Sequence, residues 1–168
     1  MTTARADTGG AVVAVADASA HRMLVVGGWD SNGRYLDSCE LYDAVADRWS
    51  MHEALLPQAM GCHAALITRG SAVVAVQSND EKKTRCALLD VRSSSSSWEP
   101  MATPESARRS HAVVAVSEYS VVMLGGEDAN WQKTDTAQMY DARAGRWSER
   151  AEWRLPAPSW AHCVVVIN

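Results

Sequence analysis

Short apolar runs separated by polar, turn-forming stretches recur along the whole chain. A first run, 11–15 or 112–116, reads Ala-Val-Val-Ala-Val in both places, and a second run follows at 23–26 or 121–124. Runs of about four to seven residues rich in Val, Leu, Tyr and Trp are typical of consecutive antiparallel strands. The first two runs of each unit are apolar on both faces, which predicts strands buried between neighbouring sheets. No stretch has the period of an amphipathic helix, so we expect an all-β fold.

The units repeat with a fixed period, because three tryptophans follow one another at intervals of 49 residues. Three features recur: a glycine pair after the second run, a tyrosine in the third and a tryptophan in the fourth. These residues are Gly27, Gly28, Tyr42 and Trp49 in the first unit, Trp98 in the second, and Gly125, Gly126, Tyr140 and Trp147 in the third. In the middle unit Val76 and Gln77 stand at the expected places of the two glycines, and no tyrosine precedes Asp90.

An apolar strand ending in Gly-Gly, then Tyr-Asp, then Trp six residues later, repeated about every fifty residues, resembles the kelch repeat. The resemblance covers about residues 10–168. It implies that each repeat forms one four-stranded blade of a β-propeller. In such a blade the glycine pair would allow a positive φ and a close backbone approach where the chain leaves the sheet. The tryptophan on the outer strand would wedge between adjacent blades.

The resemblance also predicts how the chain is divided. Residues 1–9 are expected to be a flexible N-terminus, and 10–168 a single propeller segment, which the length of 168 residues allows. Its repeats lie at about 10–58, 59–107 and 108–157, with a partial fourth at 158–168. The expected fold is a partial kelch-type β-propeller of three four-stranded antiparallel blades plus one extra strand. Propellers close with about four to eight blades. The segment is therefore either part of a longer array or one of two chains that assemble a ring by self-association.

Composition narrows the classes of partner and compartment. A net charge of −4 and an isoelectric point near 5.7 predict neither a nucleic acid nor an anionic membrane as partner. The apolar runs are far shorter than the eighteen or so residues of a membrane span, and 11–16 is too short for a secretory signal. The four cysteines include no Cys-x-x-Cys pair, which favours buried thiols over a disulfide scaffold or a zinc ribbon. We therefore expect a cytoplasmic protein.

In kelch domains partners contact the loops between the second and third strands and the loops between blades. Carried over by position, the residues expected to bind a partner are Trp29, Asp30, Asn32, Arg34 and Tyr35 in the first repeat, Glu127, Asp128, Asn130 and Trp131 in the third, and Arg108 and Arg109 between blades. Exposed Trp, Tyr and Arg are typical of binding hot spots, and paired Arg suits an acidic peptide. The alternatives are that Trp29 and Trp131 cap blade edges and that the Arg pair is solvated surface.

The resemblance favours a non-catalytic protein-interaction module that presents these loops to a protein partner. The alternative is an enzyme, either an oxidase similar to galactose oxidase or a sugar-modifying propeller. The four tyrosines do not converge on one site in the expected topology, and the chain has no nucleophile elbow or phosphate loop. A metal triad of His63, His111 and His162 is disfavoured because the first repeat has Gly10 at that place. We expect no catalytic residue, cofactor or metal.

Overall fold

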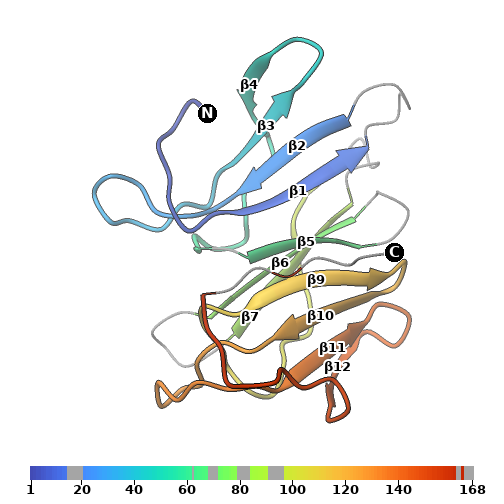
Figure 1. The fold of residues 1–168 in the computed structure, drawn as a ribbon. Coiled ribbons are helices and arrows are strands. Elements are labelled where there is room, and N and C mark those ends of the chain that lie inside the picture. The colour runs from blue at the N-terminus through green and yellow to red at the C-terminus, as the bar shows by residue number, and fades with distance from the viewer. Residues whose placement is uncertain are drawn as a thin grey trace.

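The computed structural model describes residues 1–14, 21–61, 63–67, 72–78, 84–90, 97–161 and 164. These residues form three antiparallel sheets of four strands, and in each sheet the strands lie side by side in chain order (Figure 1). The first sheet contains β1 (Gly9–Ala14), β2 (His21–Val26), β3 (Cys39–Asp43) and β4 (Arg48–Met51). The second contains β5 (His63–Ile67), β6 (Ala72–Ser78), β7 (Thr84–Asp90) and β8 (Glu99–Pro100). The third contains β9 (Ala112–Ser117), β10 (Ser120–Leu124), β11 (Ala137–Asp141) and β12 (Arg146–Arg150).

The all-β class and the three four-stranded units predicted from the sequence are confirmed, and we call the sheets the first, second and third blades. The predicted extra strand belongs to the partial fourth repeat at 158–168, of which the structure describes only 158–161 and 164. Within the part of the chain that the structure describes, no helix is long and apolar enough to cross a membrane.

The blades are arranged around their first strands. Figure 1 shows β1, β5 and β9 next to one another, whereas β4 and β12 lie at the outer edges of their sheets. Of these inner strands, β5 contacts both β1 and β9. The outer strands are more polar, and β12 reads Arg-Trp-Ser-Glu-Arg.

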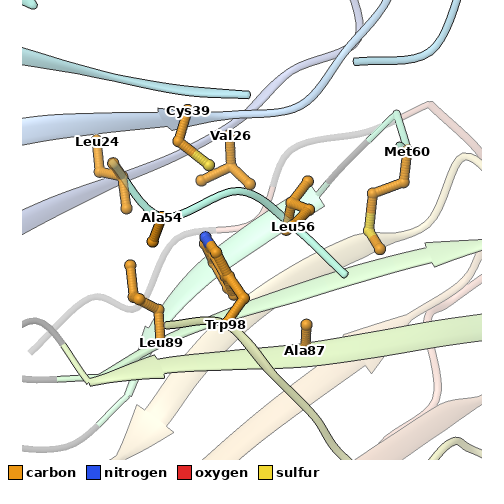
Figure 2. Close-up of a cluster of buried hydrophobic side chains, with 9 residues drawn as sticks. All are labelled: Leu24, Val26, Cys39, Ala54, Leu56, Met60, Ala87, Leu89 and Trp98. Atoms are coloured by element: carbon orange, nitrogen blue, oxygen red, sulfur yellow. The ribbon is translucent and has the colours of Figure 1, made fainter. Parts of the chain in front are cut away.

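A core of nine buried residues joins the first blade to the second (Figure 2). Leu24, Val26 and Cys39 come from the first blade, Ala54, Leu56 and Met60 from the segment that leads to the second, and Ala87, Leu89 and Trp98 from the second. The Trp98 ring lies at the middle of this cluster and is 6% exposed. Because a buried indole removes about 150–250 Å² from water, this ring is a major contact between the two blades.

A second core joins the second blade to the third. Val74, Val76 and Cys86 pack against Val121, Met123 and Tyr140, and Trp147 lies at the border of the cluster. The Trp147 indole nitrogen donates a 2.8 Å hydrogen bond to the carbonyl of Ala102, which precedes the third blade. Trp147 also stacks on Tyr140, its cross-strand partner, with ring centroids 5.5 Å apart. Trp98 and Trp147 therefore both lie at contacts between consecutive blades.

The glycine pairs have the backbone that the sequence predicts. Gly27 and Gly28 have φ values of 59° and 99°, and Gly125 and Gly126 have 58° and 88°. A Cβ at Gly28 would lie 2.6 Å from the carbonyl oxygen of Ala6, so the incoming segment passes directly over this glycine. The pair turns the chain out of the sheet and leaves room for that segment.

The register differs from the sequence alignment in the second blade. Val76 pairs with Cys86, as Val26 pairs with Cys39 in the first blade, so Gln77 and Ser78 occupy the glycine positions. Both continue the β6 strand by pairing with β7. The expectation that Val76 and Gln77 replace the glycines is therefore wrong by one residue, because a strand that never leaves the sheet there needs no glycine.

The first strand is also shifted. Gly9 pairs with Val26 in the first blade, and Ala112 pairs with Leu124 at the equivalent position in the third. The first strand β1 therefore begins at Gly9 rather than at Ala11. The two identical Ala-Val-Val-Ala-Val runs are therefore two residues out of step. A shift of two keeps every side chain on its original face of the pleat, which is why the alternation alone did not reveal it.

Residues 1–9, expected to be flexible, are held against the first blade. The backbone nitrogens of Thr2 and Thr3 donate to the Glu40 carboxylate at 2.6 and 3.0 Å, and Arg5 forms a 2.8 Å ion pair with it. The side chains of Arg5 and Glu40 are both fully buried. Ala6 exchanges two backbone hydrogen bonds with Trp29. Buried polar contacts rather than apolar packing hold this segment.

Candidate functional site: the loops after the second strands

The β2–β3 and β10–β11 loops have the same backbone, and an aspartate organises each of them. Oδ1 of Asp30 accepts hydrogen bonds from the backbone nitrogens of Asn32 and Arg34, at 2.8 and 2.9 Å. Oδ1 of Asp128 accepts equivalent bonds from Asn130 and Gln132. In the first loop, the bond from Arg34 is the main reason why the pKa of Asp30 lies below its ordinary value. Both carboxylates therefore shape their own loops, which reduces what they can offer to a partner.

The residue at the tip of each loop has a left-handed backbone, but its identity differs between the blades. Gly33 has φ 72° in the first loop, and Trp131 has φ 64° at the equivalent place in the third blade. A side chain in this conformation costs about 1–2 kcal/mol relative to glycine. Trp131 is 64% exposed, so burial of the ring does not offset that cost. The guanidinium of Arg109 lies over the Trp131 ring.

The aromatic residues of the first loop are packed instead. The Trp29 and Tyr35 rings stack with centroids 4.4 Å apart, and both side chains are half-buried. Gly61 lies beneath them, since a Cβ there would be 3.1 Å from the Trp29 indole nitrogen. This packing agrees with the alternative in which Trp29 caps a blade edge. Asn32 and Arg34 are exposed at the tip of the same loop.

The two neighbouring arginines have different environments. Arg108 is 4% exposed, and its guanidinium donates to the carbonyls of Gly125 and Thr136 and to the Thr136 hydroxyl. Arg5 makes the equivalent bonds to Gly27 and Ser38 in the first blade. Arg108 is therefore a structural clamp on the turn after β10 and is not accessible to an acidic peptide, contrary to the sequence prediction. Such a clamp leaves no signal in the local sequence, because its acceptors are 17 and 28 residues away.

Arg109 faces the loop and belongs to a cluster of charged and aromatic side chains. The Arg109 Nε lies 3.3 Å from Oε2 of Glu127. The backbones of the two residues also form an antiparallel β-bridge. The backbone of Lys133 forms an antiparallel β-bridge with that of Glu127. The Lys133 Nζ lies 5.3 Å from the centroid of the Trp160 ring. Trp160 is 48% exposed. We call Arg109, Glu127, Trp131, Lys133 and Trp160 the third-blade loop cluster.

Backbone hydrogen bonds hold the three segments of this cluster together. The backbone nitrogen of Gly126 donates to the carbonyl of Ser159 at 2.7 Å, and that of Ser159 donates to the carbonyl of Thr134 at 3.2 Å. The backbone nitrogen of Ala161 donates to the carbonyl of Ser110 at 2.8 Å. Two indoles and two cations are thus presented on a braced backbone, an arrangement suited to contacting another protein. Trp160 occupies the position of Gly61 in the first blade, because Gly126 donates to Ser159 as Gly28 donates to Met60. Its exposure follows from the third blade having Glu127 and Lys133 where the first blade stacks two aromatic rings.

The histidines that the sequence suggested as a metal triad are not arranged around one site in the part of the chain that the structure describes. His111 is buried, and its Nδ1 lies 3.1 Å from the carbonyl of Arg108. His63 is paired with Val76 inside β5, whereas His111 precedes β9, so the two histidines are not at equivalent positions. His162 lies outside the described residues. Among the residues with described side chains, no group of three His, Cys, Asp or Glu is placed to hold a metal ion.

The described thiols are free and buried. Burial raises the pKa of Cys39 to about 11, although the neighbouring Trp98 indole acts in the opposite direction. Burial raises the pKa of Cys86 to about 12. Because the thiolate is the reactive form, neither thiol is a nucleophile near neutral pH.

Comparison with known proteins agrees with the repeat. No curated protein matches the chain. The kelch motif matches residues 14–51, a range that includes the second, third and fourth strands of the first blade, its glycine pair, Tyr42 and Trp49. Most of the first blade therefore matches the kelch motif, which confirms the resemblance to the kelch repeat.

Proposed function

We propose that this chain is a non-catalytic protein-interaction module that binds a protein partner through the third-blade loop cluster. One observation carries the proposal: Trp131 is a large exposed aromatic residue in a left-handed backbone where the first blade has glycine. Residues that are unfavourable for folding and make little contact with the core are typical of functional sites.

The neighbours of Trp131 support the same conclusion. Arg109 already lies over one face of the ring, and Trp160 with Lys133 repeats the pairing of indole and cation on an adjacent segment. Trp and Arg dominate binding energy at protein interfaces because they combine a large contact area with directed hydrogen bonds. Protein binding through these loops is also what the kelch resemblance implies. The free buried thiols of Cys39 and Cys86 suit a reducing compartment, and we place the module in the cytoplasm.

The test compares partner capture by the full chain and by three variants. Trp131→Gly installs the residue that the first blade has at this position, so it removes the indole without imposing strain. Trp160→Ala removes the second indole. Val45→Ala is the matched control, because Val45 is an exposed apolar residue in the turn between β3 and β4.

Proteins captured from a cell extract are quantified by mass spectrometry against the wild type. We expect recovery of the partner to fall at least about thirtyfold for Trp131→Gly, the equivalent of a 2 kcal/mol hot spot. Recovery should fall for Trp160→Ala and remain unchanged for Val45→Ala. Equal recovery by all four proteins would contradict the proposal, provided that their unfolding temperatures show that each is folded.

A further inference from the structure

The face of the first blade that points away from the second has the same pattern as faces that are buried elsewhere in the chain. On this face, which we call the open face, Tyr42 pairs with Met23 on β2 and with Trp49 on β4. In the third blade, Tyr140 pairs in the same way with Val121 and Trp147, and these three residues pack against the second blade.

Exposure distinguishes the two equivalent faces. Met23 is 39% exposed, whereas Val121 at the same register position is fully buried. Met51 on β4 is also exposed. The one charged residue of the interior of this face, Glu40, is already neutralised by its buried ion pair with Arg5. Among the strand residues whose side chains are described, the open face therefore has the composition of a contact between blades, and its one carboxylate is paired.

The third blade carries the complementary surface. Val122, Ala137 and Met139 form an apolar cluster with Leu124 and Val114. These positions are equivalent to Leu24, Val26, Cys39 and Leu41, the surface of the first blade that packs against the second.

The segment that follows each blade completes this surface. Leu56 donates to the carbonyl of Asp37 and Leu155 to that of Asp135, which makes the two leucines equivalent. Leu56 is buried between the first and second blades, whereas Leu155 is half-buried. Trp153, two residues earlier, is 41% exposed. This side of the third blade thus presents apolar residues at positions that a following blade covers in the first two.

We infer that a second copy of this chain covers both surfaces, with the open face of each copy packed against the third blade of the other. The described residues of each chain form one surface of either kind, so the contact is head to tail. Two identical contacts close a ring with twofold symmetry. Two copies provide six blades. Three copies would provide nine, outside the range of about four to eight blades in which propellers close. The existing contacts between blades within the chain supply the template for the new ones.

The first measurement is the molar mass of the purified full chain by light scattering after size exclusion, at loading concentrations from about 1 to 100 μM. We expect twice the chain mass of 18.2 kDa. Two variants weaken the contact from opposite sides: Met23→Asp on the open face and Trp153→Asp after the third blade. Val45→Asp is the control, because it introduces the same charge at an exposed turn. The dimer dissociation constant should rise at least about tenfold for Met23→Asp and Trp153→Asp and stay unchanged for the control.

Mixing the two weakened variants tests the head-to-tail geometry. In each variant alone, both contacts of the ring contain one aspartate. In a mixed dimer, one contact is fully wild type and the other carries both aspartates. Where one aspartate is enough to open a contact, each variant alone keeps no intact contact and the mixed dimer keeps one. The mixture should then regain dimer at concentrations where either variant alone is monomeric. Circular dichroism of each peak verifies that the variants are folded.

Three results would overturn the inference: a wild-type chain that is monomeric at 100 μM, a dimer that neither substitution weakens, or a series of larger species in place of one discrete dimer. None of these outcomes involves Trp131 or Trp160. Dimer formation therefore stands or fails independently of the proposed partner site.

Discussion

Replacing Gly126 by alanine tests the close approach between the turn after β10 and the segment that enters the third blade. A Cβ on Gly126 would lie 2.5 Å from the carbonyl oxygen of Arg109 and 2.9 Å from Cβ of His111. Both contacts are well inside van der Waals distance. They involve backbone and a buried side chain, which cannot move aside as a long flexible side chain would.

The expected cost has two parts. A non-glycine residue in the left-handed region costs about 1–2 kcal/mol, and Gly126 has φ 88°. Forcing an extra methyl group into a packed site costs a further 1–3 kcal/mol or so. Gly126→Ala should therefore lower the free energy of unfolding by about 2–5 kcal/mol, a large share of the roughly 5–15 kcal/mol of a typical domain.

Gly145→Ala is the matched control, because it has only the first of these costs. Gly145 lies in the turn between β11 and β12 with φ 63°, and a Cβ there would have no atom within 4 Å. Urea unfolding of both variants, followed by tryptophan fluorescence at one protein concentration, gives the two free energies. Gly126→Ala should be the less stable variant by about 1–3 kcal/mol. Equal destabilisation of the two variants would refute the close approach as the reason for glycine at this position.

Three further substitutions test the contacts that hold the fold. Trp98→Ala should lower the free energy of unfolding, measured by urea denaturation, by about 3–5 kcal/mol, because it leaves a cavity in the core between the first two blades. A loss below 1 kcal/mol would contradict that packing. Arg108→Lys should be destabilising, because an ammonium cannot reproduce the fork to two carbonyls; unchanged urea unfolding would show that the clamp is unimportant. Burial raises the pKa of Glu40, but bonds from Thr2, Arg5 and Thr3 outweigh it and hold the pKa below its ordinary value. The stabilisation from Glu40 is therefore complete above about pH 5 and disappears as the pH falls through the native pKa. Thermal unfolding from pH 6 to pH 3 should show a smaller acid loss for Glu40→Gln than for the wild type, and parallel curves would exclude this ion pair as a source of acid sensitivity.

Strand content, blade number and the glycine pairs were accessible from the sequence because they depend on local periodicity. Alternation of apolar residues reflects the two faces of a pleat, and a repeated Trp or Gly-Gly marks equivalent places in successive sheets. The register was less accessible. The first strand shifts by two residues, since runs such as Ala-Val-Val-Ala-Val satisfy the alternation in either alignment. The middle glycine positions shift by one, since β6 continues through them and no glycine marks its end.

The tertiary structure alone decided which loop residues face the solvent. Trp29 and Trp131 occur in similar loops of the sequence, but one stacks on Tyr35 above Gly61 and the other extends from a left-handed tip. Arg108 and Arg109 are adjacent, yet only the first donates to the backbone carbonyls of Gly125 and Thr136. These outcomes depend on partners that are distant in the sequence. A short-range pattern specifies which face of a strand a side chain occupies, whereas the accessibility of a loop residue is set by whichever segment packs over it.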